Sequence, residues 1–444
     1  MQKSIYIFLI TCLICISSMN SVEAQQVISL NEAIKTALKN SYDIQLVENN
    51  LTISKNNNDY GVAGALPTLA ASANNNKSLS TIEQKFADPS RNTTKTGVDG
   101  NTLTAGLTAS VILFNGYRIM AYKDRLAMIE KQNGFLLQSQ MQNTTAQVMQ
   151  QYYNVVRQQA YLKTIEKSIE ASQQRLDIVK TRQQIGVANQ TDLLQSNIDL
   201  NALIQAKQNQ LLIIAQAKTD LARTINNDES ISSSLVINDS IQIDTKLSFD
   251  NGVNSISSGV ANNPQLAALS TQVKINQQLE KESKALMYPT LRASTGYNIN
   301  SSSSAAGFSL LNETKGPFLG VNLSIPLYGG GAAKKNVANA KISAQNANLQ
   351  MQSLNKDIYT NAFKTFDAYK NSIEQLPIES ENYSMSQSLL DLVMQKYKLG
   401  QATMVDVKQA QQSFETAGFR LVSLKYTAKV AEIELKRISN QLKF

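Results

Sequence analysis

Histidine and tryptophan are missing from this 444-residue sequence, and its only two cysteines, Cys12 and Cys15, lie close to the N-terminus. Without histidine, the chain has no Ser-His-Asp triad and no imidazole metal ligand. If the N-terminal segment is removed, the mature chain also has no thiol nucleophile and no disulfide bond. Paired carboxylates remain available, but no spacing singles out a pair. The composition therefore predicts a protein that is not an enzyme and that holds no metal or cofactor.

The N-terminal segment has the composition of a secretory signal peptide. A basic start at Lys3 is followed by an apolar stretch over 5–16 and by small residues that fit a cleavage site. We predict cleavage after Ala24, which removes residues 1–24 from the mature chain. An uncleaved signal anchor is the alternative, but the apolar stretch is short for a membrane span. A lipoprotein is disfavoured because the residues before the two cysteines fit poorly.

Long apolar runs are also missing beyond the N-terminus. No later stretch is long and apolar enough for a transmembrane helix, so any membrane span would have to be a β-barrel. The formal net charge is +8, a balance that is compatible with nucleic acid binding. The Lys and Arg residues are, however, scattered at helical spacing among Gln, Asn and Ser. We interpret them as solvated helix faces.

An internal repeat organises what is present. Each copy contains a helical run, a strand, a polar loop, a second strand and two long helices that meet at a glycine. Pro289 follows Pro67 by 222 residues and Gly400 follows Gly186 by 214, so the difference in length falls in the polar loop. Such repetition decides the organisation of the chain. We divide it into a first repeat over 25–226, an inter-repeat segment over 227–256 and a second repeat over 257–444.

Period-two alternation of apolar and polar residues predicts two strands in each repeat. The strands are expected near 68–76, 103–113, 291–299 and 319–327. They are either half-buried strands of a soluble sheet, or strands with lipid on one face and a wet lumen on the other. Their length favours the membrane alternative. The polar connections 77–101 and 301–315 would then be extracellular loops.

Four aromatic residues support the membrane alternative, because they fall at the same ends of the predicted strands in both repeats. They are Phe114, Tyr117, Tyr288 and Tyr328. We interpret them as one interfacial girdle. Four strands are too few to close a barrel, since the smallest membrane barrels have about eight. The chain would therefore have to oligomerise, and two chains or three are both compatible with closure.

Heptad patterns predict long helices that pack side by side as coiled coils. After Asp406, apolar residues recur every seven positions from Val407 to Leu435, with a second series three places later. A similar pattern over 144–185 predicts a helix of roughly 60 Å. Each helix pair turns back at a glycine, which predicts two helical hairpins. An ordinary rod-like coiled coil would explain the heptads but not the strands.

Several motifs occur in the same order in both repeats, and together they resemble the TolC-like outer-membrane efflux proteins. They include the strand ends Leu113-Phe114-Asn115-Gly116 and Pro326-Leu327-Tyr328-Gly329-Gly330, and the hairpin turns around Gly186 and Gly400. The resemblance covers essentially the whole mature chain. It implies a mixed, mainly α fold, in which a homotrimer forms a 12-stranded outer-membrane β-barrel continued by a periplasmic α-helical barrel. A mixed girdle around the middle would include the helix over 30–55 and residues 231–243.

The resemblance also implies a passive export duct that opens when a periplasmic adaptor protein and an inner-membrane transporter dock. Its gate would be a tyrosine at Tyr397, tied to Asp192 and to an arginine, but Ala402 stands at the arginine position. Of the two acid rings that narrow such entrances, Asp406 matches the first and Gln409 replaces the second. We therefore expect one ring of three carboxylates. The alternative is that Asp192 and Asp406 only cap helices.

The tip residues match the place where adaptors bind in the family that the sequence resembles. They are Gly186, Val187, Leu399, Gly400 and Gln401. Glycine at a helix C-terminus also serves as a cap, and both roles can hold together. Because Gln183 takes the place of Tyr397 in the first repeat, we expect the second tip to carry the gate. The alternative function is that of a structural coiled-coil protein of the cell envelope without channel activity.

Overall fold

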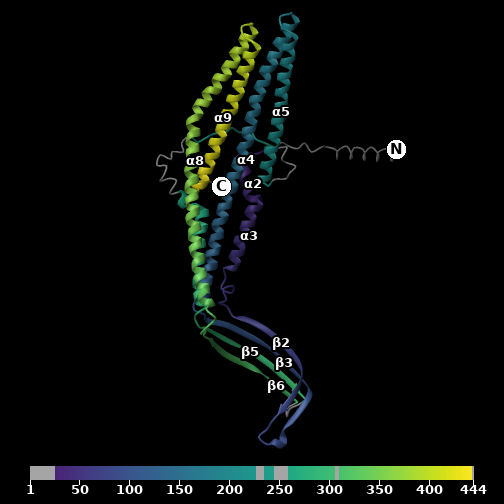
Figure 1. Cartoon of the computed structure of the whole chain (residues 1–444), viewed down its shortest axis with the longest axis vertical. Coiled ribbons are helices and arrows are strands. Elements are labelled where there is room, and N and C mark those ends of the chain that lie inside the picture. Colours follow the sequence, from purple (N-terminus) through teal and green to yellow (C-terminus); the bar gives the residue numbers. More distant parts are fainter. Residues whose placement is uncertain (1–25, 227–234, 245–258, 306–309, 443–444) are drawn as a thin grey trace, which may run out of the picture. The chain divides into compact units, whose positions relative to one another are not determined.

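A computed structural model describes residues 26–226, 235–244, 259–305 and 310–442 (Figure 1). The predicted signal peptide and most of the inter-repeat segment lie outside these residues. The chain divides into two compact units, each built from both halves of the sequence. Unit 1 takes Met1–Leu46, Gln138–Asn263 and Lys356–Phe444, and unit 2 takes Val47–Leu137 and Pro264–Asn355.

A four-stranded antiparallel sheet forms the strand portion of unit 2 and confirms the four predicted strands. Its strands are β2 (Thr68–Gln84), β3 (Thr93–Phe114), β5 (Thr290–Ser304) and β6 (Leu311–Ser324). They lie in the order β2-β3-β5-β6 (Figure 1). The pairing of β3 with β5, for example of Leu107 with Tyr297, joins strands from the two halves of the sequence.

The strands continue well into the segments that we expected to be loops, so the predicted loops at 77–101 and 301–315 are wrong. Lys77 pairs with Asn101, and Ser301 pairs with Glu313. Only a short connection with the 3-10 turn η1 (Pro89–Arg91) separates β2 from β3. In these extensions polar residues occupy both faces of the ladder. The period-two signal is therefore lost, although the backbone hydrogen bonds continue.

The two faces of the sheet differ in chemistry where the alternation is strong. One face presents exposed apolar side chains, such as Leu69, Leu107 and Val321. The opposite face carries polar cross-strand pairs: the Thr104 hydroxyl donates to the Asn300 side-chain oxygen at 3.2 Å. Cross-strand pairs of this kind stabilise a sheet locally. The apolar face has no covering layer within the described residues, so it must meet something other than water.

The polar face carries a single charged residue within the strand segments 68–80, 98–112, 290–304 and 311–324. It is Arg292, which is exposed and pairs in register with Ile112 and Asn322. Within the described part of the sheet, its guanidinium has no ion-pair partner. An arginine side chain is always charged at physiological pH.

Two helical hairpins repeat the same helix lengths. The first hairpin consists of α4 (Arg118–Gln184) and α5 (Gln190–Thr224), and the second of α8 (Ala332–Lys398) and α9 (Met404–Ile438). The first helix of each pair has 67 residues and the second has 35. The heptad series is confirmed on α9, where every member is buried: Val407, Phe414, Leu421, Ala428 and Leu435. The helix that we expected to begin at residue 144 begins at Arg118 instead. The sequence pattern did not indicate its first part, because that part lacks heptads.

The remaining elements complete the two units. They are β1 (Gln26–Val27), α2 (Leu30–Asn40), α3 (Tyr42–Asn57), β4 (Leu235–Val236) and α7 (Pro264–Ala285). In unit 1, β1 pairs in parallel with β4, and α2 packs on the hairpin helices. The largest core there joins Val148, Leu221, Leu235 and Ile433. None of the helices in the described part of the chain is long and apolar enough to cross a membrane.

Two helical glycines give opposite stability predictions. A Cβ atom on Gly418 of α9 would lie 2.8 Å from Thr164 Cγ2 of α4, whereas one on Gly134 would meet nothing within 4 Å. Gly418→Ala should destabilise the fold by about 1–3 kcal/mol through overpacking. Gly134→Ala should stabilise it by up to about 1 kcal/mol through helix propensity. Thermal unfolding followed by circular dichroism measures both, and an equal response of the two variants would contradict this packing.

Candidate functional site: the hairpin tips

Both hairpins of unit 1 turn at a glycine in the left-handed region. Gly186 has φ +79° and Gly400 has φ +77°. The amide of Val187 donates to the carbonyl of Arg182 at 2.9 Å, and that of Gln401 donates to Lys396 at 2.8 Å. These bonds close the helix ends in the Schellman arrangement, for which glycine is preferred. The capping role of the tip glycines is therefore present in the structure.

Apolar side chains project from the two turns. Ile185, Val187, Leu399 and Val405 are between 69% and 74% exposed. Gly186, Gly400 and Gln401 lie exposed beside them. Other apolar residues of α5 and α8 are exposed to a smaller degree, for example Ile198 at 60% and Leu392 at 57%. Strongly exposed apolar side chains that lie together at two neighbouring turns are typical of a surface that another protein covers.

Different residues cap the two helices that follow the turns. Asn189 caps α5, where its side-chain oxygen accepts the amide of Asp192 at 2.9 Å. Thr403 caps α9 and forms a reciprocal capping box with Asp406, whose carboxylate accepts the amide of Thr403 at 2.8 Å and its hydroxyl at 2.7 Å. These bonds lower the pKa of Asp406. Capping is thus one role of Asp406, whereas the cap of α5 is Asn189 rather than Asp192.

Tyr397 is buried where the two hairpins meet, with 4% of its surface exposed. It packs with Val179, Met394 and Val407, which come from α4, α8 and α9. Burial raises the pKa of Tyr397, an effect that the nearby Arg182 opposes and Asp192 reinforces. Within the described residues, no hydrogen bond joins the Tyr397 hydroxyl to Asp192. The two predicted gate residues are therefore close enough to interact electrostatically, but they are not bonded.

Arg182 of α4 is the arginine that contacts Tyr397, and the sequence reasoning missed it. Its guanidinium lies 4.8 Å from the centre of the Tyr397 ring and donates to the Tyr397 carbonyl. Ala402, at the expected arginine position, packs beside the same apolar cluster. Gln409 lies exposed further along α9. A basic residue in the last turn of a helix is common, so Arg182 did not stand out in the sequence.

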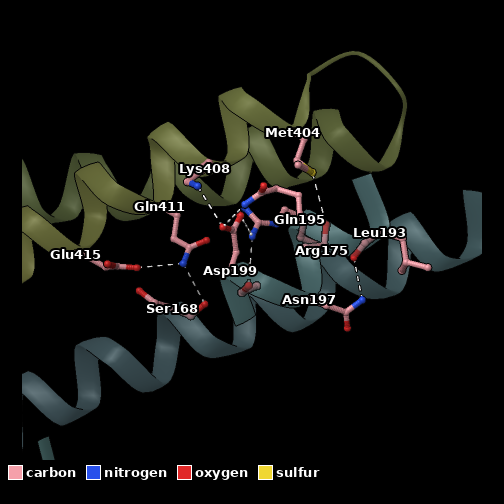
Figure 2. A network of polar contacts seen from close by, with 12 residues as sticks. Ser168, Arg175, Leu193, Gln195, Asn197, Asp199, Met404, Lys408, Gln411 and Glu415 are labelled. Carbon is pink, nitrogen blue, oxygen red and sulfur yellow. Dashed lines mark hydrogen bonds and ion pairs between the residues drawn. The ribbon is translucent and has the colours of Figure 1, made fainter. Parts of the chain in front are cut away.

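A second polar cluster lies on α4, α5 and α9 (Figure 2). Arg175 donates to Asp199 at 2.9 Å, and Asp199 also accepts from Lys408 at 3.1 Å and from Gln195 at 2.9 Å. Arg175 is only 1% exposed. These residues do not stand out in the sequence, because a charged residue inside a heptad helix is expected on a solvated face.

The predicted interface aromatics lie in unit 2, near one end of the sheet. The rings of Phe114 and Tyr117 meet edge to face, with 5.5 Å between their centres. Between them in sequence, Gly116 has φ +68° and lies against Tyr288, which leaves no room for a Cβ atom. Tyr328 follows β6 and is exposed. Among the residues that the structure describes, no group of His, Cys, Asp or Glu side chains could hold a metal ion.

The profile of the outer membrane efflux protein family matches residues 33–227 and 256–441, so the chain belongs to this family. It is 22% identical to outer membrane protein TolC of Escherichia coli over 354 residues, 77% of this chain and 70% of that protein. It is 19% identical to outer membrane efflux protein BepC of Brucella suis over 348 residues, 77% of this chain and 73% of that protein. A match to TolC of Salmonella enteritidis is 27% identical over 118 residues, 27% of this chain and 24% of that protein.

Solved structures show the same fold. The outer membrane protein VceC of Vibrio cholerae superposes with a TM-score of 0.74 at 15% identity, over 92% of this chain and 95% of that one. The CmeC outer membrane channel of Campylobacter jejuni gives a TM-score of 0.76 at 16% identity, over 96% and 92%. The resemblance seen in the sequence is thereby confirmed, together with the mainly α, TolC-like fold.

Family and fold together settle the class of the protein. It is an outer-membrane efflux channel protein rather than a structural coiled-coil protein of the envelope. Its place is the outer membrane. The family is one of channels and not of enzymes. The roles of the individual tip residues remain predictions.

The two helix caps should respond differently to acid. Because the folded pKa of Asp406 is lowered, its stabilising contribution is present above its ordinary value of 3.8 and is lost as pH falls through the folded pKa. The difference in unfolding temperature between native protein and Asp406→Ala should therefore shrink from pH 6 to pH 3. Asn189→Ala is the control: it should cost about 1 kcal/mol at every pH, because no ionisable group takes part in that cap. A pH-independent effect of Asp406→Ala would contradict the charged capping box.

Proposed function

We propose that three copies of the chain form one export duct. The sheet supports this proposal, because β2 and β6 each pair on one side only within the described residues. Unpaired strand edges are not tolerated in lipid, where only closed barrels satisfy the backbone. Three copies supply twelve strands, and the exposed apolar face would then meet lipid. One observation carries the proposal. The chain combines two coiled-coil hairpins with a sheet whose outer strands are unpaired on one side and whose two faces are apolar and polar.

The gate of the duct is the second tip, where Tyr397 is buried against α4 and α9. Arg182 supplies the contact that Ala402 does not, because it approaches the tyrosine ring from the neighbouring hairpin. Separation of the two hairpins would break this contact and expose the ring. The energy for opening comes from a periplasmic adaptor protein and an inner-membrane transporter that dock on the tips.

Two rings of opposite charge line the duct in the trimer. Asp406 gives three carboxylates at the tip, and Gln409 adds no further charge. Arg292 gives three cations on the polar face of the sheet, which becomes the lumen of the barrel. Rings of acidic side chains favour cations in a pore, and rings of arginine favour anions. Crowding of three carboxylates raises their pKa, which opposes the lowering by the capping box.

Ion selectivity of the reconstituted trimer tests the duct and its two rings. Under a potassium chloride gradient, Asp406→Ala should shift the reversal potential toward anions and weaken block by divalent cations. Arg292→Gln should shift the potential in the opposite direction. Both effects should fade at high salt, where charges are screened within roughly 3 Å. Gln409→Ala is the uncharged control, and unheated electrophoresis checks that each variant remains a trimer. A trimer that conducts no ions even with the adaptor present would refute the duct.

The exposed tip residues are the docking surface for the adaptor. Their apolar side chains and the exposed backbone of Gly186 and Gly400 offer a surface that a second set of helical tips can cover. Val187→Trp and Gln401→Trp should each abolish chemical crosslinking to the adaptor while the trimer stays intact. Thr219→Trp, on the exposed side of α5 away from the turn, is the matched control and should leave crosslinking unchanged. Full crosslinking of both tip variants would exclude this docking surface.

A further inference from the structure

Arg175, Asp199 and Lys408 form a cluster, here called the Arg175 cluster, that joins three helices of unit 1 (Figure 2). Arg175 lies on α4, Asp199 on α5 and Lys408 on α9. One carboxylate oxygen of Asp199 accepts from Arg175 at 2.9 Å, and the other accepts from Lys408 at 3.1 Å. The same carboxylate thus serves a partner in its own hairpin and a partner in the other hairpin.

Arg175 is the buried member of the cluster. Its side chain is 1% exposed, and its Nε and Nη1 atoms have no hydrogen-bond partner within the described residues. Removing a guanidinium from water is costly unless a counter-charge is close. Asp199 is the counter-charge, and it is itself 14% exposed. The buried arginine therefore fixes the position of Asp199, with Gln195 holding the second oxygen from the preceding helical turn.

Lys408 reaches this fixed carboxylate from the second hairpin. Two other ion pairs each join the two helices of a single hairpin: Lys207 pairs with Glu166 between α5 and α4, and Arg420 pairs with Glu379 between α9 and α8. Among the described residues of α4, α5, α8 and α9, the Lys408–Asp199 pair is the ion pair that connects the two hairpins. Neutral contacts accompany it, including a bond from Gln411 to the Ser168 carbonyl at 3.5 Å.

We propose that Arg175 is a positioning residue that holds Asp199 in place for Lys408, so that the Arg175 cluster keeps the two hairpins of one chain together close to their tips. Asp199 lies seven residues after Asp192, and Lys408 lies two residues after Asp406. Asp199 is therefore about 14 Å along the helix from the start of α5 at Gln190. The effect of the cluster on opening rests on the proposed function, whereas its effect on the distance between the hairpins does not.

Distance measurements between the hairpins test the cluster directly. The mature chain has no cysteine, so Val187→Cys and Val405→Cys accept two spin labels, and excess unlabelled chains leave one labelled chain in each trimer. Lys408→Gln should increase the fraction of long distances by roughly two- to five-fold, as expected for a partly exposed pair. Lys408→Arg should keep the native distribution. Lys207→Gln is the matched control, because it breaks a pair inside one hairpin.

The role of Arg175 needs a second comparison. Arg175→Gln should widen the distance as Lys408→Gln does, and the double variant should widen it no further than the larger single effect, because both act through Asp199. An unchanged distance in Lys408→Gln would overturn the proposal. Additive effects of the two substitutions would overturn the positioning role. If Arg175→Gln does not fold, the Lys408 variants still decide whether the cluster holds the hairpins.

Conductance separates this inference from the proposed function. In planar bilayers, Lys408→Gln should raise the fraction of time that the trimer is open. Each of the three chains should contribute a factor similar to the change in the distance distribution. Lys408→Arg should leave the open fraction unchanged. If the native trimer conducts but Lys408→Gln leaves its open fraction unchanged, the cluster has no role in opening. If the native trimer does not conduct at all while the distances change as expected, the proposed duct fails and the contact between the hairpins stands.

Discussion

Backbone N–H and C=O groups along the outer edges of β2 and β6 require partners, and the single chain does not supply them within its described residues. In water such edges can be hydrated, but a sheet with an exposed apolar face cannot be placed in water without a large cost. The two requirements have a common solution in a closed sheet that is surrounded by lipid. The proposed assembly from three copies would satisfy this constraint, and it would also place the polar face of the sheet along a lumen.

The tips show how a repeated sequence produces two different ends. Both turns have the same backbone, with a left-handed glycine and the same hydrogen bonds. The side chains differ, because Tyr397 of the second hairpin is buried whereas its counterpart Gln183 bonds locally to Gln190. Arg182 of the first hairpin approaches Tyr397 of the second. The asymmetry is therefore complementary, since one tip supplies the buried ring and the other supplies the cation.

Much of the fold could be predicted because its signals are local. Val407 to Leu435 repeat every seven residues, and each of them is buried as the pattern predicts. The far ends of the strands could not be predicted in this way. Residues such as Lys77 and Asn101 pair in a ladder with two polar faces, and such a ladder leaves no alternating pattern in the sequence.

The site was harder to predict than the fold, because its contacts join residues that are far apart in the sequence. The glycine turns and Tyr397 could be identified from local motifs. Arg182 and Arg175 could not, since nothing near them in the sequence distinguishes them from solvated basic residues. Their contacts depend on how α4 packs against α5, α8 and α9, and this packing is a property of the three-dimensional structure.

The equal lengths of the two hairpins restrict how this chain can change in length. Both hairpins combine a helix of 67 residues with one of 35. One additional heptad in α4 alone would displace its turn by about 10 Å along the helix axis and move Arg182 away from Tyr397. To keep the tips level, an insertion would have to occur in all four helices at once and in steps of seven residues. The lengths of the four hairpin helices are therefore coupled to one another, whereas the loops and the strand extensions can vary in length individually.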